Sequence, residues 1–241
     1  MTGTLLNIAT VLIGSLLGVL LGGRLNDSVR ETVLRGLGLI TVAIGLQMAL
    51  QTANMLIVLG AVLVGGLLGE WWGIEAGLNR AGAWLEARFN RRSGAENSPR
   101  FIRGFVTASL LFCVGPMTIL GSIQDGLSGD YRLLAIKAML DGFASLAFAS
   151  SLGIGVAFSA LVILFYQGGL SLLAAQVQTL LTPPMIAEMT ATGGVLILGL
   201  GISTLLEIKP IRVGNFLPAL VIAPLVVWAL TVLGLPIAPP F

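Results

Sequence analysis

The sequence predicts an all-α membrane protein, a polytopic bundle of about eight transmembrane helices. Of its 241 residues, 56% are hydrophobic and only 10% are charged, and the mean hydropathy is +0.99. This is more apolar surface than one soluble core can hide. Several stretches of about 18 or more mostly apolar residues are long enough to cross about 30 Å of hydrocarbon as helices. We therefore expect the lipid bilayer to be the main partner of the chain.

The expected helices follow from the apolar stretches and from the polar residues that separate them. The chain begins "MTGTLLNIATVLIGSLLG", with no basic segment before the apolar run and no clean cleavage site. This stretch is therefore expected to be a spanning helix and not a signal peptide. The longest polar run, about 79–103, separates the third helix from the fourth. In chain order, helices are expected at about 4–23, 31–50, 54–73, 101–121, 131–151, 154–176, 191–208 and 216–234.

The basic residues predict the orientation in the membrane, because cytoplasmic loops retain Lys and Arg. All of the 13 basic residues except Arg132 and Lys137 lie in the connections after the first, third and seventh helices. With eight helices, these connections share one face, which we expect to be cytoplasmic, and both termini lie outside. The net charge is only +2, and the topology explains the spread of basic residues better than nucleic-acid binding does.

The composition excludes several enzyme classes. The chain has no histidine, whereas Ser-His and Cys-His nucleophile pairs, His-ligated zinc and His-ligated haem all need an imidazole. Its single cysteine, Cys113, lies in an apolar segment, so an intrachain disulfide is impossible. No cofactor and no metal site are expected.

Two segments of the chain resemble each other. The stretch 38–51, "GLITVAIGLQMALQ", aligns with 194–207, "GVLILGLGISTLLE". The alignment predicts that helices 1–3 repeat as helices 6–8 in inverted orientation around helices 4 and 5, a design that secondary transporters use. The alternative is a chance match between Gly- and Leu-rich helices. The expected segments are a first repeat at 1–78, a basic cytoplasmic loop at 79–100, a central pair at 101–153 and a second repeat at 154–241.

The stretch "CVGPMTILGSIQDGLSGD", residues 113–130, predicts a break inside the fourth helix. Pro116 has no N–H and disfavours the helical conformation at Gly115, so the hydrogen-bond ladder is interrupted at membrane depth. Transporters build substrate and ion sites at such breaks, although an ordinary proline kink is the alternative. The candidate pathway residues here are Gly115, Pro116, Thr118, Ser122, Gln124 and Asp125. Asp130 fits a surface turn better.

The fifth helix adds two charges within an apolar segment. Lys137 and Asp141 are four residues apart in "LLAIKAMLDGFASLAF" and so share one helix face. Intramembrane ionisable residues usually face the bundle interior or a water-filled path. Asp141 is therefore a candidate protonatable or cation-binding carboxylate, with Lys137 tuning its charge. A static ion pair that fixes helix packing is the alternative.

Glycines recur at every fourth position in two helices. Such faces allow close helix packing, and they suit either an internal helix contact or the seam of a homodimer. The candidate packing residues are Gly14, Gly18, Gly22, Gly65, Gly69 and Gly73.

The strings "CVGPMTILGSIQDGLSGD" and "AIKAMLDGFASLAFASSLG" resemble the signature region of the YqgA-type (YdfK-type) bacterial integral-membrane proteins, a family of unknown function. The resemblance extends over the whole chain, from "NIATVLIGSLLG" onwards. It implies a bacterial inner-membrane protein and supplies no substrate.

Three functions compete. The favoured one is a transporter or channel for a small solute or ion, with a path at the broken helix and the fifth helix. A membrane scaffold or assembly protein without transport activity is the second. An intramembrane aspartyl hydrolase that pairs Asp125 with Asp141 is the third and weakest, because the two residues are expected at different depths. We therefore expect no enzyme activity.

Overall fold

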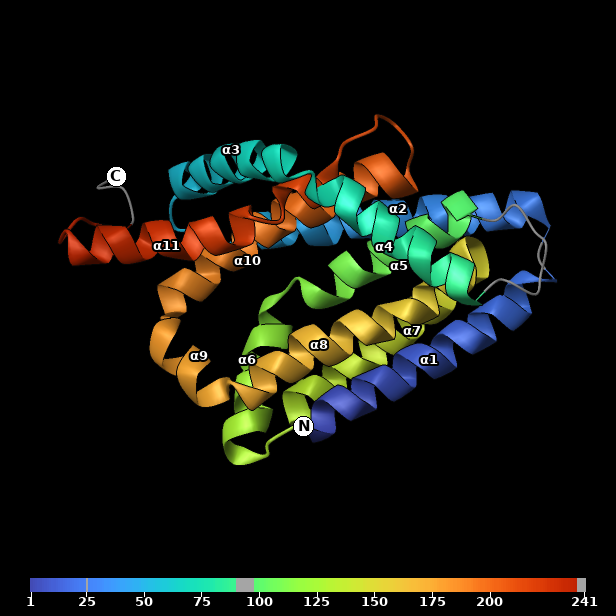
Figure 1. The fold of residues 1–241 in the computed structure, drawn as a ribbon, viewed down its shortest axis with the longest axis horizontal. Helices are drawn as coiled ribbons and strands as arrows, with labels where there is room; N and C mark the ends of the chain where they lie inside the picture. The colour runs from blue at the N-terminus through green and yellow to red at the C-terminus, as the bar shows by residue number, and fades with distance from the viewer. Residues whose placement is uncertain (25, 90–97, 238–241) are drawn as a thin grey trace. The chain divides into compact units, whose positions relative to one another are not determined.

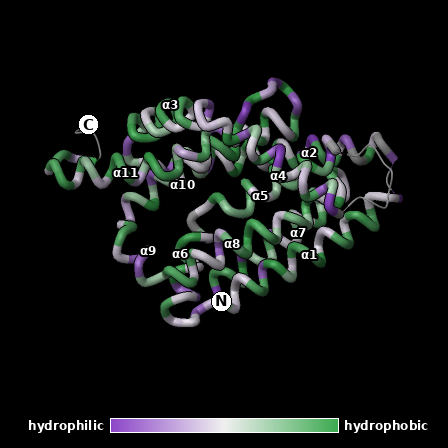
Figure 2. The backbone as a smooth tube through the Cα atoms, viewed as in Figure 1, coloured by the Kyte–Doolittle hydropathy of each residue, from purple (hydrophilic) through white to green (hydrophobic). Residues whose placement is uncertain are grey.

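The computed structural model describes residues 1–24, 26–89 and 98–237, and in these ranges the chain is helical with no β-strand (Figure 1). Seven helices are long and apolar enough to cross a membrane, or eight if one bent pair counts as a single span. In Figure 2 the long helices are mostly green, whereas purple segments gather at helix ends and in connections. The predicted all-α polytopic membrane bundle is confirmed.

The chain divides into two compact units, each built from distant stretches of sequence. Unit 1 comprises Met1–Leu37 and Leu78–Val177, and unit 2 comprises Gly38–Gly77 and Gln178–Phe241. Unit 1 thus combines an N-terminal stretch with the central part of the chain, and unit 2 combines an earlier stretch with the C-terminal part. The units therefore do not coincide with the expected segments 1–78 and 154–241.

Unit 1 contains several long helices and the broken span. Helix α2, Asp27–Ala49, begins in unit 1 and ends in unit 2. The other elements are α1 (Thr2–Gly22), most of α4 (Ile74–Phe89), α5 (Ser98–Cys113), α6 (Pro116–Ser128), α7 (Arg132–Leu152), a 3₁₀ turn η1 (Ile154–Phe158), α8 (Ser159–Leu172) and the start of α9 (Ala174–Leu180).

Helices α1 and α7 pack through three glycines of α1, each of which lies against a backbone carbonyl oxygen of α7. The pairs are Gly14 with Gly142, Gly18 with Leu146 and Gly22 with Ser150. The residue numbers rise together, so the two helices run parallel. A Cβ atom at any of these glycines would overlap the facing carbonyl. The structure therefore assigns this glycine face to an internal contact and not to a homodimer seam.

The predicted break in the fourth span is confirmed. Helix α5 ends at Cys113, α6 begins at Pro116, and the two segments are bent by 63°. Gly115 adopts φ 153° and ψ 152°, a conformation that is essentially restricted to glycine. The Thr118 hydroxyl donates a hydrogen bond across the break to the Phe112 carbonyl oxygen at 3.3 Å.

Unit 2 is built around an apolar core between its helices. Ile57, Ala61, Ala219 and Val227 are among the buried members of this core. The elements are the second half of α2, α3 (Met55–Trp72), α10 (Pro183–Leu200), a π-helical turn η2 (Gly201–Leu205), a 3₁₀ turn η3 (Val213–Phe216) and α11 (Ala219–Val232).

Helices α2 and α10 cross antiparallel through glycines at the positions that the predicted repeat aligned. The Cβ position of Gly201 lies 3.2 Å from the Gly38 carbonyl oxygen. The Cβ position of Gly194 lies 2.7 Å from the Gly45 carbonyl oxygen. The alignment pairs Gly38 with Gly194 and Gly45 with Gly201. Exchanging each residue for its aligned counterpart converts the Gly38–Gly201 contact into the Gly194–Gly45 contact, so the crossing has a local two-fold relationship.

The glycines of α3 have two different roles. Gly65 lies against Ala219, and Gly69 lies against the backbone of Asn215, so both pack internally. Gly73 corrects the prediction, because among the described residues no atom of a packing neighbour lies within 4 Å of its Cβ position. It ends α3 with φ 63°, a left-handed cap conformation that favours glycine.

Several predicted boundaries differ from the structure. The fourth helix, expected to end near 121, continues as α6 to Ser128. The polar run expected as the loop 79–100 is helical as far as Phe89, because α4 spans Ile74–Phe89. Arg91, Arg92 and the rest of that loop up to residue 97 lie outside the described residues. Helix α10 begins at Pro183 and not near 191, since the proline pair occupies the first turn, where no N–H is needed. The helix expected to run to 176 ends at Leu172, and a short helix α9, Ala174–Leu180, follows.

Candidate functional site

A continuous chain of hydrogen bonds crosses the interior of unit 1. Lys137 forms an ion pair with Oδ2 of Asp141. The same Oδ2 accepts a hydrogen bond from Nδ2 of Asn7 at 3.0 Å, and Asn7 Nδ2 also donates to Oε1 of Gln167 at 3.0 Å. Gln167 Nε2 in turn donates to the Thr4 hydroxyl at 3.2 Å. We call these five residues the polar network.

The polar network joins three spans and is almost fully enclosed. Thr4 and Asn7 come from α1, Lys137 and Asp141 from α7, and Gln167 from α8. Thr4, Asn7 and Gln167 have no exposed surface, and the two charged residues are also buried. Asp141 lies about 14 Å along α7 from its first residue, at 1.5 Å per residue. A charge pair at this depth is stabilised by its own hydrogen bonds, since little water is available.

Helix α6 presents a second buried polar face. Thr118, Ser122 and Asp125 follow a spacing of four and three residues, so they share one side of the helix, and all three are buried. Oδ2 of Asp125 accepts a hydrogen bond from the backbone N–H of Gly3 at 3.1 Å and lies 3.0 Å from the amino group of Met1.

Gln124, a predicted pathway residue, lies on the opposite side of α6 and is exposed. Thr118, Ser122 and Asp125 on α6 are buried in unit 1, as are Lys137 and Asp141 on α7. Gly115 and Pro116 form the break itself. The structure thus brings the α6 face and the α7 pair into one unit and leaves Gln124 outside this arrangement.

Several buried oxygen atoms of unit 1 have no hydrogen-bond partner among the described residues. Such atoms are rare in proteins, because an unsatisfied buried polar atom destabilises the fold by about 1–3 kcal/mol. All of them can accept a hydrogen bond or coordinate a cation. They are Asn7 Oδ1, Ser15 Oγ, Ser122 Oγ, Asp125 Oδ1 and Ser171 Oγ, together with the hydroxyls of Thr107 and Ser109.

The turn between α6 and α7 contains Asp130, which was expected to lie in a surface turn and pairs there with Arg132. Arg132 donates hydrogen bonds to both carboxylate oxygens of Asp130, at 2.9 and 2.6 Å. These bonds lower the pKa of Asp130 from 3.8 to about 2. Asp130 is therefore ionised throughout the physiological pH range.

The prediction missed several buried polar residues, among them Thr4, Asn7, Gln167 and Glu188. Thr4, Asn7 and Gln167 lie inside predicted spans, and an amide within an apolar helix is the signal that could have identified Asn7 and Gln167. Glu188 falls in a stretch that was expected to be a loop. Its Oε2 accepts from the Thr52 hydroxyl at 2.6 Å, and its Oε1 accepts from the backbone N–H of Ala53 at 2.8 Å.

Among the described residues, no group of three or more His, Cys, Asp or Glu side chains is placed to hold a metal ion. The helices and the enclosed polar network define a polytopic α-helical membrane protein.

Comparison with known proteins identifies its family. The chain belongs to the family described as "Protein of unknown function (DUF554)", whose model matches residues 2–228. It is 33% identical over 239 residues to the "Uncharacterized membrane protein YdfK" of Bacillus subtilis (strain 168), covering 98% of this chain and 99% of that protein. It is 35% identical over 221 residues to the "Uncharacterized protein YqgA" of Escherichia coli (strain K12), covering 92% and 94%. No solved structure matches the chain.

Proposed function

We propose that this protein is a bacterial inner-membrane transporter or channel for a small solute or ion, with its path in unit 1. The polar network is the observation that carries the proposal. A static helix contact can be made with apolar side chains, whereas intramembrane charges and amides that link three spans are typical of solute and proton pathways. Replacing such a buried pair by apolar residues is often neutral for stability, so stability alone does not explain the pair.

The break between α5 and α6 supports the same proposal. It places the start of α6 inside a span, and the buried face with Ser122 and Asp125 follows directly. The unpartnered oxygens of Asn7, Ser122 and Asp125 belong to the same unit. An oxygen-rich, carboxylate-containing set favours a cation or a solute that donates hydrogen bonds.

The α2–α10 crossing supports an inverted repeat within the proposed transporter. The Gly38–Gly201 and Gly45–Gly194 contacts exchange under the alignment of the two segments. Inverted repeats allow two alternative arrangements of equivalent helices around one site, which is the basis of alternating access.

The two alternative functions have less support. A scaffold that works through its glycine faces needs those faces to be available, but Gly14, Gly18 and Gly69 pack internally. An aspartyl hydrolase needs Asp125 and Asp141 to share a proton. The two carboxylates instead have separate partners, on Gly3 and Asn7, one helical turn apart on α1.

Flux into liposomes tests the proposal. Purified protein is reconstituted and assayed with a panel of small cations, anions and amino acids, with and without a pH gradient. We expect a solute that moves with the wild type and fails to move with Asp141→Asn. The matched control is Asp130→Asn, which removes an aspartate from the exposed turn and should leave flux unchanged.

A second variant separates transport from folding. Because Asp141→Asn leaves Lys137 buried without its carboxylate, the variant Lys137→Met/Asp141→Leu removes both charges together. We expect this variant to fold and to be inactive. Normal flux in a folded Lys137→Met/Asp141→Leu protein would show that the pair is structural. No flux of any solute with the folded wild type would favour the scaffold.

A further inference from the structure

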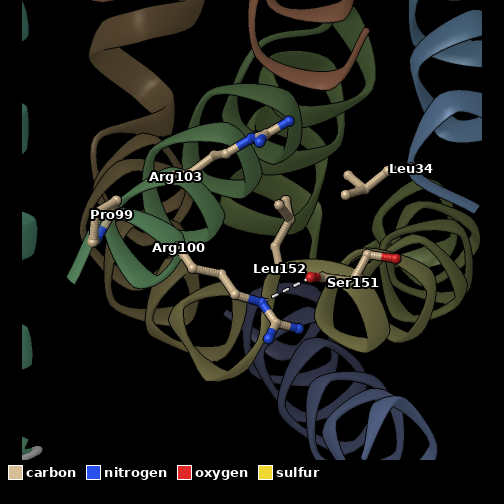
Figure 3. A pocket seen from close by; sticks show the side chains of 6 residues that line it. All are labelled: Leu34, Pro99, Arg100, Arg103, Ser151 and Leu152. Atoms are coloured by element: carbon tan, nitrogen blue, oxygen red, sulfur yellow. Dashed lines mark hydrogen bonds between the residues drawn. The ribbon is translucent and has the colours of Figure 1, made fainter. Parts of the chain in front are cut away.

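A pocket of about 380 Å³ lies in unit 1, where α5 begins and α7 ends. Its lining combines two arginines and a serine with three apolar residues, and none of these residues is acidic. The lining residues are Leu34, Pro99, Arg100, Arg103, Ser151 and Leu152 (Figure 3).

The two arginines lie on one face of α5, and Arg100 is anchored to α7 by a hydrogen bond. Arg100 and Arg103 are three residues apart in the first two turns of α5, so they share one face of the helix. Nε of Arg100 donates a hydrogen bond to the Ser151 carbonyl oxygen at 2.9 Å, which orients its side chain toward the end of α7. Figure 3 shows both arginine side chains extending from α5, with the Leu152 side chain between them in this view.

The chemistry of the lining favours an anion with an apolar attachment. A guanidinium presents several N–H donors in a rigid plane and binds phosphate oxygens through paired hydrogen bonds. The first turn of α5 adds the positive end of a helix dipole beside the arginines. Leu34, Pro99 and Leu152 give the same pocket apolar surface, which a hydrated inorganic ion would not use.

The position along the chain agrees with this chemistry. Arg100 and Arg103 directly precede the apolar stretch 105–114 of the broken span. Basic pockets between helices at the edge of a membrane bind phospholipid head groups.

We propose that this pocket binds a phosphate group carried on a small organic moiety, such as the head group of an anionic phospholipid. A soluble phosphate ester offers the same chemistry, and the test distinguishes the two sources. The site is separate from the polar network, and the proposal does not depend on transport.

The test measures ligand binding to detergent-solubilised full-length protein. One arm titrates phosphatidylglycerol, with phosphatidylcholine as the lipid control, and counts bound lipids by native mass spectrometry. The other arm titrates glycerol phosphate and inorganic phosphate by calorimetry. The variants are Arg100→Gln/Arg103→Gln and the conservative Arg103→Lys, which keeps the charge and loses the planar donors. Arg88→Gln, at an exposed arginine of α4, is the matched control.

We expect phosphatidylglycerol to bind the double variant at least about tenfold more weakly, the loss expected for charge-assisted hydrogen bonds. Arg103→Lys should lose an intermediate amount of lipid affinity, and this variant keeps the test decisive if the double variant does not fold. Arg88→Gln should bind lipid like the wild type. Binding of glycerol phosphate but not lipid, with the same dependence on the arginines, would identify a soluble ester as the source. The proposal is overturned if the wild type binds neither ligand, or if folded arginine variants bind as tightly as the wild type.

Discussion

The side-chain amide of Asn7 on α1 donates a hydrogen bond to the carboxylate of Asp141 on α7 at 3.0 Å, across 134 positions of the sequence. Through this bond the ion pair of α7 is connected to Gln167 of α8. The bond turns a pair of charges on one helix into a network that spans three helices. Asp141 is therefore held by a partner outside its own helix, and substitutions at Asn7 should change the position of its carboxylate.

Removal of one charge from the Lys137–Asp141 pair should destabilise the protein more than removal of both. Asp141→Leu leaves an uncompensated ammonium in the interior, which costs about 3–5 kcal/mol, whereas the double change Lys137→Met/Asp141→Leu should cost clearly less. Unfolding by SDS in mixed micelles gives the free energy of each variant. Equal losses of unfolding free energy in the single and double variants would show that Lys137 and Asp141 do not stabilise each other.

Gly18→Ala should destabilise unit 1, because its added methyl group would meet the Leu146 carbonyl oxygen and the Ala149 Cβ. We expect a loss of about 1–3 kcal/mol from this overpacking. The control is Gly36→Ala in α2, where no neighbouring atom of the part of the chain that the structure describes lies within 4 Å of the Cβ position. This change should be neutral or stabilise the helix by up to about 1 kcal/mol. Similar thermal stabilities for the two variants would show that the α1–α7 contact is looser than described.

Glu188→Ala should loosen the start of α3 in unit 2. The Glu188 carboxylate accepts hydrogen bonds from the Thr52 hydroxyl and from the backbone N–H groups of Ala53 and Asn54. Their loss should increase amide hydrogen exchange in residues 53–57 before it affects α1 and α7. Thr52→Val removes only one of these bonds and should have a smaller effect. Unchanged exchange at 53–57 in Glu188→Ala would argue against this role.

Asp130 should not contribute to any pH dependence of flux above about pH 4. Its pKa is lowered from 3.8 to about 2 by hydrogen bonds from Arg132. A lowered pKa in the folded state gives a stabilisation that is present above the ordinary value and is lost as the pH falls toward 2. Arg132→Gln should return the pKa toward 3.8, measured by carboxyl NMR of labelled protein. An unchanged pKa in this variant would show that Arg132 is not its cause.

The two ends of unit 1 should lie on opposite sides of the membrane. The end with the arginines of α4 and α5 should face the cytoplasm, and the end with the α6–α7 turn should face outward. The only native cysteine, Cys113, is buried, so introduced cysteines report their own accessibility. We expect a membrane-impermeant maleimide to label Ser128→Cys in intact spheroplasts and Ala87→Cys only after permeabilisation. The reverse pattern would invert the predicted orientation.

The sequence predicted most of the span positions because apolar length and proline chemistry are local properties. The Gly115–Pro116 break is confirmed for this reason, since the missing N–H of Pro116 acts on its own helix. The start of α10 was placed too late, because Pro183 and Pro184 are compatible with a first helical turn as well as with a loop. Gly73 was assigned to packing from its spacing alone, although its left-handed conformation is what requires glycine.

By itself, the sequence determined that this is a polytopic helical membrane protein, with a break in the fourth span and a charge pair in the fifth. These properties depend on neighbouring residues and on helix periodicity. Only the tertiary structure decided that Asn7 and Gln167 complete the polar network and that Gln124 is exposed. It also assigned the glycine faces of α1 and α3 to internal contacts. Such facts depend on which helices pack together, because residues more than 100 positions apart meet only when the bundle folds.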